Sequence, residues 1–254
     1  MLSMDQSTYS SLTNSPMTNS QVSYPQFLEN KVLDVKPQGF DINLTLLHES
    51  TKPHQLDTIK WAAKGGRRAG FLGFGLGKTL IQLTLASGLC DAALIICPLG
   101  VIHEFQAEAE RIGIEFSVVM NDAEALEAEF PIHLSTYESV RDGKLSVERY
   151  VLVTLDEASI LRTDNSKTHH TFIELFKNTP LKYVFTATPS PNDFIELIYY
   201  AAFLGIMDKS QCKTRFFQRD STKADKLTLL PHKEREFWLW VSSWACFVTT
   251  PSDL

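Results

Sequence analysis

Residues 69–79 read AGFLGFGLGKT, in which a short apolar run leads into spaced glycines and then a lysine and a threonine. Such glycines let successive backbone N–H groups turn inward around a phosphate, and a helix that starts behind them adds the positive end of its dipole. Lys78 is then placed to reach the β and γ phosphates of a nucleotide, and the Thr79 hydroxyl to bind magnesium. The residues of this loop expected to contact the nucleotide are Gly75, Leu76, Gly77, Lys78 and Thr79.

Leu72 stands where the full phosphate-loop pattern, GxxxxGK[ST], has a glycine. A glycine-rich turn that carries a chance Lys-Thr pair is therefore the alternative interpretation. The apolar run before the loop and the helical pattern after it favour a nucleotide-binding loop, because a chance turn requires neither.

Further short apolar runs alternate with helical segments along the chain. Continuous apolar runs of this kind are typical of a parallel sheet covered by helices on both faces. The sequence therefore predicts an α/β fold with a mostly parallel sheet, whose ligands bind at the carboxyl ends of the strands. The expected strands are 69–74, 92–97, 114–120, 132–135, 150–155 and 182–186, and the expected helices are 77–89, 101–111 and 171–177.

Two adjacent carboxylates, Asp156 and Glu157, end the β-branched run 150–155. Taken alone, such a pair is more often the acidic start of a helix. In a parallel sheet that also carries a phosphate loop, the catalytic interpretation is favoured: Asp156 holds magnesium, and Glu157 orients and deprotonates the attacking water. The expected catalytic residues are Lys78, Asp156 and Glu157, and the expected metal ligands are Thr79 and Asp156.

Gln55 lies shortly before the phosphate-loop strand. A glutamine amide can pair with both N6 and N7 of adenine. The alternative is a polar residue at the start of a helix, and the residue alone favours that alternative.

Six short motifs follow one another in a fixed order. Together they resemble the first half of superfamily-two helicases and translocases, closest to the Swi/Snf-like branch and to phage-encoded DEAD/DEAH-type helicase proteins. The resemblance runs from about residue 27 to the end of the chain. The motifs are PHQ at 53–55, GLGKT at 75–79, ICPL at 96–99, STYE at 135–138, DEAS at 156–159 and TATP at 186–189.

The resemblance implies a RecA-like domain that uses ATP and Mg²⁺ and acts on DNA, either duplex or single-stranded. It implies that Gln55 contacts adenine and that Thr186 and Thr188 couple hydrolysis to movement of the lobe. Ser159 stands where DEAD- and DEAH-box enzymes carry Asp or His, which argues against a strict RNA helicase. The residues implied to approach the nucleic acid are Pro98, Leu99, Thr136 and Tyr137.

The chain divides into three expected parts. Residues 1–25 are rich in Ser, Thr, Asn and Gln and predict a disordered leader. Residues 26–205 hold the RecA-like ATP-binding domain. Residues 206–254 form a helical tail leading towards an absent second motor lobe, with one helix over 234–248. The apolar positions 237, 240, 241, 244 and 248 fall at helical spacing, so an aromatic face with Trp240 and Trp244 is expected to be partly exposed.

The composition of the chain limits the class of protein and its expected location. A net charge of −6 argues against a protein that coats nucleic acid through many phosphate contacts. The four cysteines are scattered without metal-ligand spacing, as in reduced cytosolic proteins. No signal peptide is visible, and the apolar stretch 92–102 is too short to span a bilayer. We expect a cytoplasmic protein of a bacterial or phage-infected host cell, with no membrane partner.

Two functions remain open at this stage. The first is the ATP-binding first motor lobe of a superfamily-two DNA helicase or translocase, a nucleic-acid-dependent ATPase that needs a second RecA-like lobe in cis or in trans. The second is a nucleotide-binding interaction module without motor activity of its own. A P-loop kinase is disfavoured by Leu72 and by the TATP segment. Arg162 and Arg215 are the candidates for an arginine finger in cis, and neither has an evident path to the γ phosphate.

Overall fold

The computed structural model describes residues 35–39, 41–89, 92–162, 167–190, 193–219 and 226–253. All of these fall in one compact unit, Asp34–Leu254. The predicted leader, residues 1–25, lies outside the described residues.

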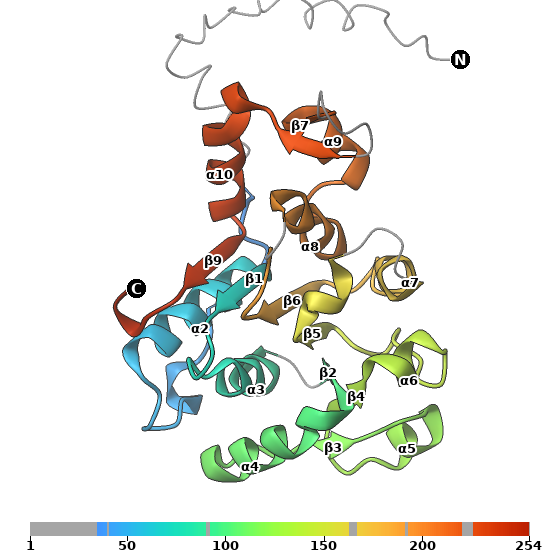
Figure 1. The fold of residues 1–254 in the computed structure, drawn as a ribbon. Coiled ribbons are helices and arrows are strands. Elements are labelled where there is room, and N and C mark those ends of the chain that lie inside the picture. The colour runs from blue at the N-terminus through green and yellow to red at the C-terminus, as the bar shows by residue number, and fades with distance from the viewer. Residues whose placement is uncertain are drawn as a thin grey trace, which may run out of the picture. The chain divides into compact units, whose positions relative to one another are not determined.

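Seven strands within the described residues form one sheet, in the order β3–β4–β2–β5–β6–β1–β9 (Figure 1). Every neighbouring pair in this sheet is parallel, as the continuous apolar runs predict. A separate antiparallel pair, β7 and β8, completes the strands of the described region. Their bounds are β1 Arg67–Leu72, β2 Ala93–Cys97, β3 Ser117–Val118, β4 Ile132–Thr136, β5 Leu152–Asp156, β6 Leu181–Thr186, β7 Phe217–Arg219, β8 Leu227–Leu229 and β9 Ala245–Val248.

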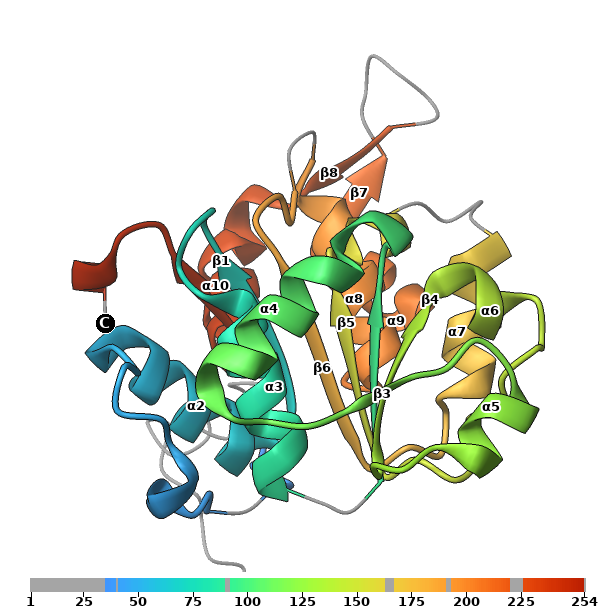
Figure 2. The same cartoon turned by 90° about the horizontal axis from the view of Figure 1, so that it is seen from below.

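Helices cover both faces of the sheet, as Figure 2 shows. Helices α2, α3 and α4 lie on one face, and α7, α8 and α9 lie on the other. Six short 3₁₀ turns also occur within the described residues, from η1 before α2 to η6 after β9. The helix bounds are α2 Pro53–Gly65, α3 Lys78–Leu89, α4 Ile102–Ile112, α5 Asp122–Glu127, α6 Tyr137–Arg141, α7 Lys167–Leu175, α8 Leu197–Leu204, α9 Lys209–Phe216 and α10 Glu234–Ser242.

Local sequence explains where α2 begins and ends. Pro53 occupies its first position, where the missing N–H would have had no helical partner. Gly66 follows its last residue with φ 72°, the left-handed conformation that suits glycine, and its N–H donates to the Ala62 carbonyl oxygen. The chain therefore turns directly from α2 into β1, which carries the phosphate loop at its far end.

The strand order brings the predicted site elements together at the carboxyl ends of neighbouring strands. β5, β6 and β1 are consecutive neighbours, so the segments that follow them leave the sheet side by side. Phe71 of β1 lies opposite Thr186 of β6, and Phe185 of β6 lies opposite Asp156 of β5. These positions lie at the carboxyl ends of the strands, where parallel sheets bind their ligands.

The expected strand over 114–120 is mostly wrong. Within it the structure has only the two-residue strand Ser117–Val118 beside β4, with one further backbone hydrogen bond of 3.0 Å from Val119 N to Leu134 O. Gly113, with φ 70°, ends α4 just before it, and Asn121 begins α5 just after it. Little of the run remains for pairing at this edge of the sheet.

The expected continuous helix over 234–248 is also wrong. Helix α10 stops at Ser242, and the chain then enters the sheet as β9, parallel to β1. Trp240 and Trp244 are buried, with ring centres 5.4 Å apart, so the expected partly exposed face does not form around them. The sheet thus extends past residue 205 into the segment described from sequence as a tail.

In the part of the chain that the structure describes, no helix is long and apolar enough to cross a membrane.

Candidate nucleotide-binding site

A cavity of about 740 Å³ lies at the carboxyl edge of β1 and β5. The phosphate loop, the start of α2, helix α4 and the end of β5 line it. It brings together nearly all the predicted nucleotide and catalytic residues, from motifs that are up to about 100 positions apart in the chain. Its lining includes Gln55, Gly75, Gly77, Lys78, Thr79, Asp156 and Glu157.

The phosphate loop depends on two left-handed glycines. Gly75 has φ 75° and Gly77 has φ 81°, a conformation that other residues adopt at a cost. A Cβ on Gly77 would also collide with the Gln55 side-chain nitrogen, whereas a Cβ on Gly75 would meet open space. Leu76, between them, is buried and points into the core rather than at the cavity. Its expected contact with a nucleotide therefore falls to its backbone.

Lys78 begins α3 and keeps its ammonium at the loop. The Nζ atom donates to the carbonyl oxygens of Leu72 at 3.2 Å and Gly73 at 3.3 Å. It also lies 5.4 Å from the ring centre of Phe74, which is 82% exposed. The charge thus sits beside backbone N–H groups that are suited to an anion.

Asp156 ends β5 in a largely buried position. Its Oδ1 atom accepts a hydrogen bond of 2.7 Å from Gln82 Nε2, and its backbone oxygen accepts one of 2.8 Å from the Tyr137 hydroxyl. Burial raises the pKa of this carboxyl to about 6, against the lowering effects of the Gln82 hydrogen bond and the Lys78 charge. At neutral pH a nearby cation stabilises the charged form of such a buried carboxylate, and this suits a magnesium ligand.

Glu157 follows Asp156 in an unusual backbone conformation. Its φ is 48°, the one positive value at a non-glycine residue within the described region. Its Oε1 atom accepts a hydrogen bond of 2.9 Å from Thr186 Oγ1. The left-handed turn thus aims the carboxylate at the end of β6, and such strained positions are common at functional sites.

The two predicted coupling threonines belong to the same hydrogen-bond chain. Thr188 N donates to Thr186 Oγ1 at 3.1 Å, and Thr188 O accepts from Arg162 Nη1 at 3.1 Å. Arg162 Nε in turn donates to Ser159 O at 3.0 Å. Two hydrogen bonds therefore connect the segment after β5 with the segment after β6, one from Thr186 to Glu157 and one from Arg162 to Thr188. Arg162, considered above as an arginine finger, makes the second of these bonds.

Gln55 combines the two interpretations made from sequence. Its Oε1 accepts from Lys52 N at 2.9 Å, the bond of a helix-start residue, and its Nε2 donates to Leu76 O at 3.3 Å. Each of these atoms retains one further hydrogen-bonding capacity. The side chain also lines the cavity, so a helix-start role and a contact with a base are compatible.

The four residues expected near nucleic acid divide into two kinds. Pro98 lines the nucleotide cavity, and Leu99 is 66% exposed. Thr136 and Tyr137 are buried. The Thr136 hydroxyl caps α6 by accepting from Ser139 N, while burial raises the pKa of Tyr137 well above its usual range. Thr136 ends β4 and Tyr137 begins α6, so no loop forms at this pair, and both side chains are packed inside the domain.

Sequence reasoning missed several residues of the site. Gln82 is fully buried and bonded to Asp156. Its signal was the one side-chain amide in a mostly apolar helix, four residues after Lys78 and hence on the same helical face. Three charged residues of α4 also line the cavity, and they are Glu104, Glu108 and Arg111. Arg111 pairs with Glu108 and donates to Ser50 Oγ at 2.6 Å.

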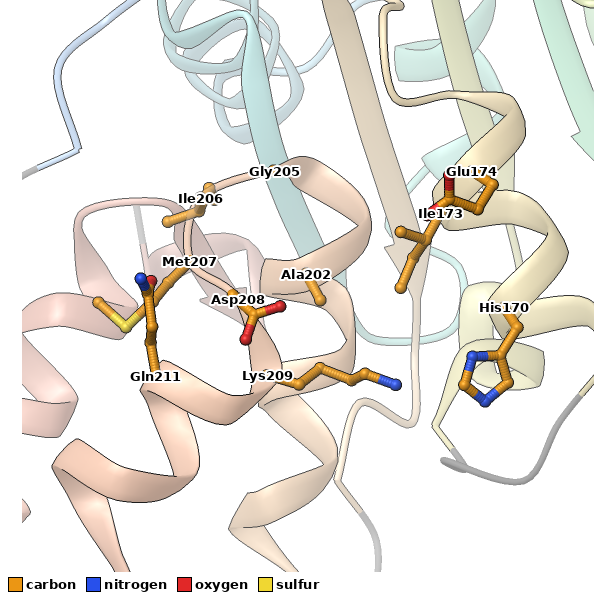
Figure 3. A pocket seen from close by; sticks show the side chains of 10 residues that line it. All are labelled: His170, Ile173, Glu174, Ala202, Gly205, Ile206, Met207, Asp208, Lys209 and Gln211. Atoms are coloured by element: carbon orange, nitrogen blue, oxygen red, sulfur yellow. The ribbon is translucent and has the colours of Figure 1, made fainter.

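A second hollow, of about 580 Å³, lies between α7, α8 and α9 (Figure 3). His170 and Glu174 face it from α7, and Asp208 and Lys209 from the start of α9. No residue predicted to bind nucleotide, metal or nucleic acid lines it, so it is separate from the nucleotide cavity.

The arrangement of these residues agrees with comparisons to known families. Residues 54–230, more than half of the chain, match the SNF2-related domain family. The chain belongs to this family. The match confirms the resemblance to Swi/Snf-like superfamily-two enzymes, and with it a helicase-like ATPase lobe.

One curated relative and several solved structures are similar to this SNF2-related domain. A Danio rerio chromodomain-helicase-DNA-binding protein 1-like is 28% identical over 176 residues, covering 60% of this chain and 17% of the relative. The Sulfolobus solfataricus SWI2/SNF2 ATPase core in complex with dsDNA is 21% identical, with a TM-score of 0.67, over 83% of this chain and 47% of that chain. The UvsW helicase from bacteriophage T4 is 15% identical, with a TM-score of 0.51, over 72% of this chain and 66% of that chain.

These similarities have defined limits. The structural matches show a RecA-like fold shared with superfamily-two ATPases. The SNF2-related domain spans less than half of the Sulfolobus chain and under a fifth of the Danio protein. The comparisons give no support to the expected bacterial or phage origin.

Proposed function

We propose that this chain is the ATP-binding first motor lobe of a superfamily-two DNA translocase. It couples ATP hydrolysis to movement on DNA when a second RecA-like lobe is present, in cis or in trans. The observation that carries the proposal is the cavity of about 740 Å³ in which Lys78, Thr79, Asp156 and Glu157 converge. Its glycine loop, ammonium and buried carboxylate are the donor set that a magnesium–nucleotide complex requires.

Each residue of this set has a defined task. The backbone amides around Gly75 and Gly77, with Lys78, hold the phosphates. Thr79 and Asp156 would hold Mg²⁺, which would neutralise charge on the β and γ phosphates. Glu157 orients the attacking water and takes its proton. The contact between Glu157 and Thr186 places this base one hydrogen bond from the coupling segment.

Coupling follows from the same contact. When Glu157 turns towards water and phosphate, its bond to Thr186 changes, and with it the bonds through Thr188 to Arg162. The segment after β6 thereby senses the state of the nucleotide. A two-state element biased by the ligand is what a coupled motor needs.

DNA is the proposed track. The Sulfolobus core, which shares the fold, was solved with dsDNA. In this chain the exposed Leu99, in the 3₁₀ turn Leu99–Val101 that follows β2, offers a limited contact surface at the carboxyl ends of the strands. A few backbone contacts, rather than broad charge attraction, agree with the net charge of −6.

We also propose that turnover by this chain alone is slow. Of the arginines considered from sequence, Arg162 bonds Ser159 and Thr188, and Arg215 pairs with Glu236. Arg111 lines the cavity but is held by Glu108. An arginine finger accelerates phosphoryl transfer by roughly 10³–10⁵. A second lobe is the proposed source of that group.

The test measures steady-state ATP hydrolysis with and without duplex DNA, over a range of protein concentrations. The chain alone is expected to bind ATP and hydrolyse it slowly, and addition of a second lobe is expected to produce DNA-stimulated turnover. Glu157→Gln should keep ATP binding and lose hydrolysis. Binding with no hydrolysis under any of these conditions would favour the alternative, a nucleotide-binding interaction module.

A further inference from the structure

Gln82 is a fully buried amide that none of the proposed steps uses. Its Nε2 donates to Asp156 Oδ1 at 2.7 Å, and its Oε1 accepts from Thr154 Oγ1 at 2.8 Å. Thr154 is fully buried too. Both ends of the amide are therefore used, and both partners belong to β5.

The geometry of the two elements explains the arrangement. Thr154 and Asp156 are two residues apart on β5, so their side chains point to the same face of the sheet. Helix α3 covers that face. Gln82 is four residues after Lys78 and shares its face of α3. One rigid helix thus presents a phosphate-binding ammonium from its first turn and an amide to Asp156 from its second.

The chemistry fixes the direction of the amide. An ionised carboxylate only accepts hydrogen bonds, so the NH₂ group of Gln82 must face Asp156. The carbonyl end then faces Thr154, whose hydroxyl donates to it. The carboxylate opposes a flip of the amide, because a flip would set the amide carbonyl oxygen against the carboxylate oxygens. The Thr154 hydroxyl holds the carbonyl end of the amide in the observed orientation.

We propose that Gln82 is a positioning residue, supported by a hydrogen bond from Thr154, that occupies Oδ1 of Asp156 and so leaves Oδ2 for magnesium. Asp156 is then held by its side chain as well as by the Tyr137 bond to its backbone. The distance between the metal carboxylate and the phosphate loop is set through α3. This inference rests on the proposed magnesium–ATP site.

A merely structural role of Gln82 predicts a different result. If Gln82 only joins α3 to β5, its loss weakens the fold and affects every ligand of the site alike. A positioning role predicts a selective loss, in which metal-dependent binding suffers and metal-independent binding does not. Groups that orient metal ligands typically contribute about 10–100-fold to metal affinity.

The experiment titrates Mg²⁺ into full-length protein with ATP, and reads binding by displacement of a fluorescent ATP analogue. ATP affinity is also measured in EDTA. In Gln82→Met, which keeps the volume and removes the amide, the Mg²⁺ concentration for half-maximal binding should rise by about tenfold. ATP affinity in EDTA should stay within about twofold of wild type. Thr154→Val, which removes the hydrogen bond that holds the carbonyl end of the amide, should shift the Mg²⁺ requirement in the same direction by a smaller factor.

Thr84→Val is the matched control, since Thr84 is buried on the same helix and makes no contact with Asp156 that the structure shows. It should leave the Mg²⁺ requirement unchanged. Equal losses with and without metal, or an unchanged Mg²⁺ requirement in both Gln82→Met and Thr154→Val, would overturn the inference. If Gln82→Met does not fold, Thr154→Val decides alone. Wild-type ATP binding that Mg²⁺ does not strengthen would instead overturn the proposed function.

Discussion

The phosphate loop and the segment 234–253 lie side by side in the molecule, yet the sequence describes them unequally. β1 and β9 are parallel neighbours, and Gly73 N at the start of the loop donates to Val248 O at 2.9 Å. The strand, glycine turn and helix start of the loop were predicted from eleven residues and are present in the structure, while its binding of nucleotide stays a prediction. The segment beside it was predicted as one continuous helix and is instead a helix followed by a strand.

The two segments differ in whether nearby residues or a strand far away in the sequence determine their conformation. The conformation of the phosphate loop depends on local requirements, namely two glycines at positive φ and a helix start at Lys78. β9 exists because it pairs with a strand about 175 positions earlier, and no local pattern reports that pairing. The apolar spacing at 237, 240, 241 and 244 continues to 248 by coincidence, since one buried face of a helix and one buried end of a strand both require apolar residues.

Lys78→Ala is expected to have the largest effect on the nucleotide side of this comparison. It removes the cation placed for the β and γ phosphates, and ATP binding should become undetectable at millimolar nucleotide by calorimetry. Lys60→Ala, which changes an exposed lysine of α2, is the control and should bind like wild type. Equal nucleotide affinity in Lys78→Ala and wild type would refute the assignment of the loop.

Trp244→Ala should give the largest effect on the other side. Trp244 is fully buried against Trp240 and lies 6.4 Å, ring centre to ring centre, from Phe71 of β1. Its truncation should lower the free energy of unfolding by about 3–5 kcal/mol in urea titrations. Leu239→Ala, at a side chain that is 45% exposed, should cost much less. Similar losses in the two variants would contradict the packing of β9 and α10.

The same difference between local and long-range causes decides how much of the site could be predicted. The sequence predicts that Lys78, Thr79, Asp156 and Glu157 lie close together, and all four line one cavity, because each lies at or just beyond the carboxyl end of a strand in a parallel sheet. The bonds between motifs, such as Glu157 with Thr186, depend on strand order, which the sequence does not state.

The burial of Thr136 and Tyr137 was equally invisible, because the sequence does not show that α6 begins directly at the end of β4. Gln82 left a signal, a polar residue within an apolar helix, but its partners lie more than 70 positions away.

Gln55→Ala should have an intermediate effect and sharpen the base end of the site. Guanine presents an acceptor where adenine presents a donor, so wild type should prefer ATP over GTP by about 1–3 kcal/mol, and the variant should lose most of that preference. The ratio of the two affinities is the readout, because Gln55 also bonds Lys52 and Leu76 and its loss can weaken both nucleotides together. Equal potency of GTP and ATP in wild type would refute an adenine contact.

Arg215→Ala should have the smallest effect. Its ion pair with Glu236 joins α9 to α10 at a partly exposed position, where such pairs contribute about 0–1 kcal/mol. Thermal unfolding should shift by only a few degrees, and ATP hydrolysis measured beside a second lobe should be unchanged. A large loss of hydrolysis with normal stability would show that Arg215 acts at the nucleotide after all.

The most direct test is a crystal structure of this chain with Mg²⁺ and a non-hydrolysable ATP analogue. The account predicts the β and γ phosphates against the amides of the loop and Lys78, with the metal between Thr79 and the Asp156 oxygen that Gln82 does not occupy. A nucleotide bound in the hollow between α7 and α9, or phosphates held away from the loop that follows β1, would contradict it.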